Sequence, residues 1–214
     1  MKKVSALSVL VLVAVLATIV INVLANALPL NGQNTGDISD SFSIFFVPSG
    51  YVFSIWGVIY LFLGGFAVFQ LLPSQQENPR LKRIRPLALL AAAANIVWIF
   101  FWHYNLYPLT LVAMLVLLGA LLAIYLNLKV GTIQVGRREF WLAHVTHSIY
   151  LGWITVATIA NVTQVLFYIN WDGFGLAPQL WAVIMLAATV VIGGLMAFTR
   201  RDIAYLLVLV WAIV

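Results

Sequence analysis

Residues 4–24 read VSALSVLVLVAVLATIVINVL, a stretch without a charged side chain. A helix needs about 20 predominantly apolar residues to cross the hydrocarbon core of a bilayer. Lys2 and Lys3 precede the stretch and Ala25-Asn26-Ala27 follows it, so a cleaved secretory signal is an alternative. Because the apolar part of such a signal is only about 7–15 residues long, we expect a retained first transmembrane helix.

The composition extends this conclusion to the whole chain. Of its 214 residues, 64% are hydrophobic and 8% are charged. Soluble domains are about half apolar and about a quarter charged, and disordered chains are more polar still, so both classes are excluded. Unbroken apolar runs also argue against a transmembrane β-barrel, whose strands alternate. The sequence therefore predicts an all-α fold, a polytopic transmembrane helical bundle.

Further apolar segments predict the remaining spans. We expect them at 51–72, 87–102, 109–128, 140–167 and 179–198, with polar loops at 26–50, 73–86, 129–139 and 170–178. A last apolar segment, 203–214, rises only about 18 Å as a helix, against a core of about 30 Å. We expect this seventh segment to be incomplete and the natural chain to continue past it.

The charges predict the orientation. If the loops alternate across the membrane, all 11 Lys and Arg residues fall on one side, and Asp37, Asp40 and Asp172 on the other. Cytoplasmic loops are enriched in Lys and Arg, so we expect a cytoplasmic N-terminus and an outer loop at 26–50. The net charge of +5 then reflects topology, and we expect no nucleic-acid partner. No Asp, Glu, Lys or Arg lies within the expected spans, which argues against an ion pump or voltage sensor.

Aromatic and carboxamide side chains recur at helical spacing inside the spans. Each of three spans carries such a stripe on one face: Phe53, Trp56 and Tyr60; Asn95, Trp98 and Trp102; Tyr150, Trp153, Ala157 and Asn161. The rise of a helix places most of these residues in the outer half, beneath the long outer loop. Aromatic walls with a few polar groups suit a flat, mostly apolar ligand.

Two alternatives to a ligand site remain open at this point. Trp and Tyr residues can form the aromatic belt at the membrane surface, which suits Trp102, Tyr104 and Tyr107. Asn95 and Asn161 can make hydrogen bonds between helices.

The sequence carries no strong signal for catalysis or metal binding. His144 and His147 are three residues apart on one predicted helix, a spacing that can bind a metal ion. No third ligand is evident nearby, so we expect no metal site. The absence of cysteine excludes disulfides and thiolate chemistry. No Ser/His/Asp set or phosphate-binding Gly loop is present, so we predict no catalytic residues.

Three segments resemble a known family. Residues 150–161, YLGWITVATIAN, resemble the fifth-helix pattern of the tryptophan-rich sensory protein/translocator protein family (TspO/MBR), also called the peripheral-type benzodiazepine receptor family. Residues 95–102 and 48–60 resemble its third and second helices. Two departures are Ile149, where the family has Pro, and the lack of the family's Trp and Pro upstream of Trp56. The resemblance covers residues 5–168 and implies a five-helix core at 1–168, with two additional segments at 169–214, as in a longer bacterial-type branch.

The resemblance also implies a function. The family binds porphyrins, sterols and synthetic aromatic ligands beneath its first loop. The expected ligand-binding residues are Trp56, Tyr60, Asn95, Trp98, Trp102, Trp153, Ala157 and Asn161. We expect a non-catalytic receptor or carrier in the bacterial plasma membrane that binds a tetrapyrrole such as a porphyrin and requires no cofactor. Gly57, Gly64 and Gly65 could pack a homodimer. A transporter of small uncharged solutes, a porphyrin-degrading enzyme and a purely structural membrane protein are the alternatives.

Overall fold

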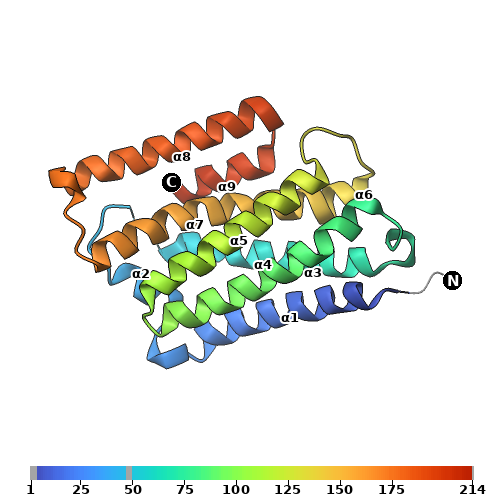
Figure 1. The fold of residues 1–214 in the computed structure, drawn as a ribbon, viewed down its shortest axis with the longest axis horizontal. Helices are drawn as coiled ribbons and strands as arrows, with labels where there is room; N and C mark the ends of the chain where they lie inside the picture. The colour runs from blue at the N-terminus through green and yellow to red at the C-terminus, as the bar shows by residue number, and fades with distance from the viewer. Residues whose placement is uncertain (1–3, 47–49, 214) are drawn as a thin grey trace.

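The computed structural model describes residues 4–46 and 50–213, and it is helical throughout, without a strand in those ranges (Figure 1). The predicted all-α fold is confirmed. The helices are α1 (Ala6–Ala27), α2 (Thr35–Asp40), α3 (Ile55–Leu71), α4 (Pro79–His103), α5 (Tyr107–Leu128), α6 (Arg137–Glu139), α7 (Thr146–Tyr168), α8 (Pro178–Arg200) and α9 (Ile203–Ile213). A 3₁₀ turn, Gly50–Ser54, leads into α3, and a π-helical turn, Phe140–Val145, joins α6 to α7.

Six of the helical stretches described are long and apolar enough to cross a membrane. They are Ala6–Ala27, Gly50–Leu71, Pro79–His103, Tyr107–Leu128, Arg137–Tyr168 and Pro178–Arg200. These correspond to the six complete spans predicted from the apolar runs. Helix α9 has 11 described residues, fewer than the roughly 20 that a membrane-spanning helix needs.

The bundle is built around α4, α5 and α7. Helix α4 packs along α5 and against α1, and α7 packs between α5 and α9 (Figure 1). Helix α4 has four buried alanines, at positions 88, 91, 92 and 94, so the surface that it packs against these neighbours is made of small side chains. Small residues let helix backbones approach closely in a membrane, where packing replaces the hydrophobic effect as the force that joins helices.

The last two helices attach to this bundle through α9. A Cβ atom on Gly152 of α7 would lie 3.1 Å from Cβ of Val208 in α9, so glycine is what allows this close approach. The Asp202 carboxylate, just before α9, accepts hydrogen bonds from the hydroxyls of Tyr125 (2.8 Å) and Ser148 (2.6 Å). Helix α8 lies at the periphery, and its buried residues are Thr189 and Gly193.

The start of α4 corrects the predicted loop at 73–86. The helix begins at Pro79, inside the loop predicted at 73–86, because the Asn78 side chain accepts hydrogen bonds from the first backbone N–H groups and proline fits the first helical position. Arg85 therefore lies inside the helix and is only 2% exposed. Its guanidinium donates to Oε1 (3.1 Å) and the backbone oxygen (3.0 Å) of Gln70. Arg85 is thus a buried residue of α4, two positions before the span predicted at 87–102.

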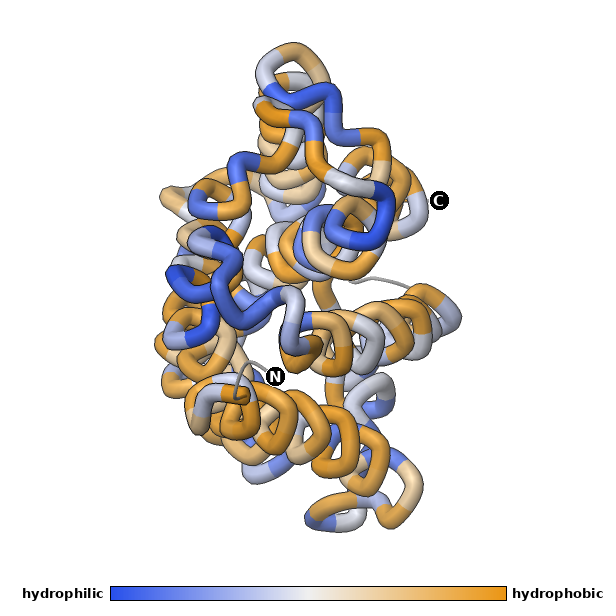
Figure 2. Tube along the Cα trace, turned by 90° about the vertical axis from the view of Figure 1, so that its right-hand side faces the viewer, coloured by the Kyte–Doolittle hydropathy of each residue, from blue (hydrophilic) through white to orange (hydrophobic). Residues whose placement is uncertain are grey.

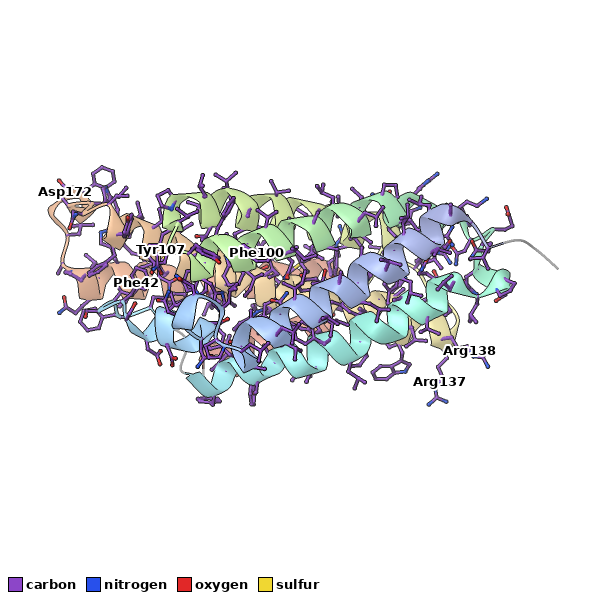
Figure 3. The ribbon with its side chains drawn as sticks, turned by 90° about the horizontal axis from the view of Figure 1, so that it is seen from below. Phe42, Phe100, Tyr107, Arg137, Arg138 and Asp172 are labelled. Atoms are coloured by element: carbon purple, nitrogen blue, oxygen red, sulfur yellow. The ribbon has the colours of Figure 1, made fainter. Side chains whose placement is uncertain are left out.

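The two ends of the bundle differ in charge. Arg137 and Arg138 project from the end where the chain starts, and Asp172 lies at the opposite end (Figure 3). Arg80 pairs with Glu139 (2.7 Å) at the first end, and the Gly131 turn contacts the backbone of Arg200 there. Figure 2 looks onto this end, where hydrophilic loops cover the ends of apolar helices. We call it the basic end and the opposite one the acidic end.

Candidate functional site

Seven of the eight predicted site residues line one cavity. It lies among α3, α4, α5 and α7, and it has a volume of about 40 Å³. The predicted residues that line it are Trp56, Asn95, Trp98, Trp102, Trp153, Ala157 and Asn161. Helical periodicity brings them together, because each stripe of residues three or four apart turns the same face of its helix inward.

Tyr60 lies outside this cavity. It lines an adjoining groove of about 480 Å³ between α1 and α3, and its ring stacks on Trp56 with the centroids 5.4 Å apart. Phe53, Trp56 and Trp98 line both spaces, so these three rings form the wall between cavity and groove.

Two groups of aromatic rings flank the cavity. In the first, the Trp56 and Phe53 rings meet the Trp153 ring edge-on, with centroids 6.1 and 5.8 Å away. In the second, Trp98 stacks on Trp102 with centroids 5.3 Å apart. Trp98, Trp102 and Trp153 are buried, so the alternative of a surface aromatic belt does not apply to them.

Tyr107, a belt candidate, is also buried, at the edge of the second ring group, where it meets Trp102 with centroids 5.7 Å apart. Tyr104, in contrast, is exposed and suits a belt.

Asn95 joins three helices. Its Oδ1 accepts a hydrogen bond from Asn22 Nδ2 of α1 (2.7 Å), and its Nδ2 donates to the Tyr150 hydroxyl of α7 (2.9 Å). Asn95 is fully buried. The alternative of a hydrogen bond between helices is therefore confirmed for Asn95, which lines the cavity at the same time.

Asn161 has a similar arrangement at the other side of the cavity. Its Oδ1 accepts a long hydrogen bond from Trp98 Nε1 (3.4 Å), and its Nδ2 donates to Thr110 Oγ1 of α5 (2.8 Å). Asn95 thus connects α4 to α1 and α7, and Asn161 connects α7 to α4 and α5.

Trp153 carries a polar atom without a partner. Its side chain is 2% exposed, and its Nε1 makes no hydrogen bond to any residue in the described ranges. A buried donor left unpaired costs about 1–3 kcal/mol. Trp153 is also one of the residues that line the cavity.

Helix α2 covers the cavity from the acidic end. The Trp102 indole donates to the backbone oxygen of Thr35 (3.2 Å), and Gln164 Nε2 donates to Ser39 Oγ (3.3 Å). Ser39 and Gln164 also line the cavity. The outer loop predicted at 26–50 is thus partly a helix, which is tied to α4 and α7.

Sequence reasoning missed several of these residues. Asn22 is the one carboxamide within residues 4–24, and that position inside the first span could have marked it as a partner for Asn95. Ser39 and Gln164 are 125 positions apart, and neither the loop nor the helix pattern signals their contact.

The histidines do not form a metal centre in the part of the chain that the structure describes. His147 Nδ1 lies 2.7 Å from the backbone oxygen of Ala143, and its ring meets Phe66 edge-on. Within those ranges, no group of three or more His, Cys, Asp or Glu residues is placed to hold a metal ion.

Comparison with known proteins supports the resemblance seen in the sequence. No curated protein and no solved structure matches the chain. The family model of the TSPO-like proteins matches residues 8–214, which includes all of α8 and α9 as well as the helices around the cavity. Together with the six apolar helices, this match identifies an integral membrane protein. The chain belongs to the TSPO-like family.

Proposed function

We propose that this protein is a membrane receptor or carrier that binds a planar hydrophobic ligand, such as a porphyrin, in the cavity beneath α2. The observation that carries the proposal is the cavity lining, where aromatic rings and carboxamides from separate helices come together with Trp153, whose N–H is unpaired among the described residues. Membership of the TSPO-like family supports a receptor or transport role in a membrane.

The lining favours an aromatic ligand. Its side chains are aromatic, aliphatic or small and polar, and among the described residues none is acidic, basic or an imidazole. Flat rings stack on indole faces or meet their edges, and a few carboxamides fix the orientation of polar atoms. Such a lining binds a ligand without supplying a group for proton transfer, so we place binding ahead of porphyrin degradation.

The cavity must open to admit such a ligand. Sites for drug-sized molecules measure about 300–1,000 Å³, whereas this cavity measures about 40 Å³. The rings of Phe53, Trp56 and Trp98 line both this cavity and the groove of about 480 Å³ beside α1. Rotation of Trp56 would join the two spaces and would bring Tyr60 into contact with the ligand. The proposal therefore requires a second, open form of the site.

The charge distribution supports an orientation in a bacterial plasma membrane. With the basic end in the cytoplasm, the N-terminus is cytoplasmic and the cavity lies toward the outer leaflet. The propionates of a porphyrin would then point toward the outer loop. No further cofactor is required for this role.

A homodimer stays a prediction. Gly65 already contacts Leu142 within the chain, while Gly57 and Gly64 face open space.

The test is quenching of tryptophan fluorescence by protoporphyrin, titrated against the purified protein in detergent. Trp153→Phe keeps an aromatic ring but removes the N–H, and we expect an approximately 10-fold loss of affinity, equivalent to one hydrogen bond. Ala157→Phe fills the cavity, and we expect it to abolish saturable binding. Trp171→Phe, outside the cavity, is the control. Unchanged affinity in both cavity variants would refute the site.

A second measurement separates a carrier from a receptor. The measurement is protoporphyrin flux into proteoliposomes. Flux with the unsubstituted protein that is lost in Ala157→Phe, where the cavity is filled, would identify a carrier. Saturable binding without flux would identify a receptor.

A further inference from the structure

A second apolar space lies on the surface of the bundle, between α3, α7 and α9. It is a groove of about 500 Å³, and its lining side chains are apolar apart from Ser54. Val58 and Phe62 line it from α3, Trp141 and Ile149 from the π turn and α7, and Leu207 and Trp211 from α9. It shares no lining residue with the aromatic cavity.

Two close helix contacts shape this groove. A Cβ on Gly65 of α3 would lie 2.9 Å from Leu142 in the π turn, and one on Gly152 of α7 would lie 3.1 Å from Val208 of α9. These glycines hold α3 and α9 directly on the α7 segment. That segment forms the floor of the groove, and α3 and α9 form its walls.

The groove is closed toward the acidic end. Trp211 Nε1 donates to the backbone oxygen of Val52 (3.1 Å), and its ring meets Tyr51 edge-on at 5.6 Å. From Ile203 to Trp211, α9 rises about 12 Å. That length is close to the hydrocarbon depth of one leaflet, about half of a 30 Å core.

Arginines flank the other end of the groove. Arg137 and Arg138 lie about one helical turn before Trp141, and Arg201 lies two residues before Ile203, which lines the groove. All three arginines are exposed and make no ion pair within the described ranges, and Arg137 and Arg138 project away from the bundle (Figure 3).

The two carboxylates nearest in sequence are engaged elsewhere. Glu139 pairs with Arg80 (2.7 Å), and Asp202 accepts from Tyr125 and Ser148. The basic mouth of the groove therefore keeps its positive charge.

We propose that this groove binds an anionic phospholipid from the leaflet at the basic end. One acyl chain lies between α3 and α9, and the phosphate contacts Arg137, Arg138 and Arg201. An apolar channel of one-leaflet length that ends at exposed guanidinium groups matches the two parts of such a lipid. Arginine pairs with phosphate through two parallel N–H donors, and basic pockets beside membrane helices recruit anionic head groups.

The charge arm of the test compares lipids that differ only in the head group. The purified protein is mixed with equal amounts of phosphatidylglycerol and phosphatidylcholine of identical acyl chains, and bound lipid is counted by native mass spectrometry. We expect a preference for phosphatidylglycerol that falls about 10-fold in the double variant Arg137→Gln/Arg138→Gln. The control, Arg83→Gln/Lys129→Gln, removes the same charge from exposed positions outside the groove. An equal fall in both variants, or no initial preference, would overturn the proposal.

The groove arm tests where the acyl chain lies. Val58 (46% exposed) and Val116 (41% exposed) are both lipid-facing valines, but only Val58 lines the groove. We expect Val58→Trp to lower the bound phosphatidylglycerol at least 5-fold and Val116→Trp to leave it unchanged, with thermal unfolding showing that both variants are folded. Unchanged binding in Val58→Trp, or an equal loss in both variants, would place the lipid elsewhere.

Discussion

The hydrogen bonds of Asn95 offer a direct test of how the bundle is held together. Replacing Asn95 by leucine keeps the approximate size of the side chain but removes its bonds to Asn22 (2.7 Å) and Tyr150 (2.9 Å). These bonds connect α4 with α1 and α7 in the fully buried interior. The substitution therefore tests hydrogen bonding between helices rather than packing volume.

The structure sets the size of the expected effect. A hydrogen bond between helices in a membrane contributes about 0.6 kcal/mol on average and about 1.7 kcal/mol at most. Two bonds give about 1.2 kcal/mol. Asn22 retains a bond from its Nδ2 to the backbone oxygen of Thr18 (2.9 Å), so α1 keeps one satisfied donor. We expect Asn95→Leu to lower the free energy of unfolding by about 1–2 kcal/mol.

The assay is unfolding by SDS in mixed micelles, applied to a double-mutant cycle of Asn22→Leu and Asn95→Leu. The cycle isolates the pairwise energy, which we expect at about 0.6 kcal/mol. Asn127→Leu is the control, because the side chain of Asn127 donates to the backbone oxygen of Ala123 within its own helix (2.8 Å) and makes no other hydrogen bond among the described residues. A coupling energy of zero, or an equal loss of stability in the control, would refute the reasoning.

Three further predictions follow from other contacts. Asp202→Ala removes the acceptor for the hydroxyls of Tyr125 and Ser148, so we expect the free energy of unfolding to fall by about 2 kcal/mol or more. Hydrogen exchange in α9 should become faster, and unchanged slow exchange there would contradict this prediction. Gly152→Ala should lower the thermal midpoint because its Cβ meets Val208, whereas Gly119→Ala, with open space around it, should preserve or raise the midpoint. Trp102→Phe should speed hydrogen exchange in α2, since the indole bond to Thr35 is lost, and unchanged exchange would show that α2 is held by other contacts.

The apolar pattern predicts the spans well because the bilayer imposes their length and composition. The start of α4 shows the limit of that pattern. Arg80, Lys82, Arg83 and Arg85 have the composition of a loop, yet Asn78 and Pro79 carry the sequence signal for a helix start. The helix buries Arg85 because Gln70, on α3, supplies two acceptors. The composition of residues 73–86 alone cannot reveal that another helix supplies hydrogen-bond acceptors for Arg85.

The cavity shows a similar division. A spacing of three or four residues predicts which side chains share a helix face. It correctly grouped Asn95 with Trp98, and Trp153 with Asn161, as residues that line the cavity. Which faces meet depends on the rotation of each helix about its axis, so Thr110 as partner of Asn161 was not predictable. The closed volume of about 40 Å³ depends on side-chain rotamers, which the sequence pattern does not determine.

The carboxamides of the site can serve both the bundle and a ligand. A carboxamide has two N–H donors and an oxygen with two lone pairs. Asn95 and Asn161 each use one N–H donor and one oxygen lone pair within the protein. Each therefore retains one N–H donor and one lone pair for a ligand. Replacing either residue by alanine should therefore weaken folding and binding together. Trp153 Nε1 makes no bond within the described residues, so Trp153→Phe should weaken binding while stability stays nearly unchanged. That difference separates a ligand site from a set of helix contacts.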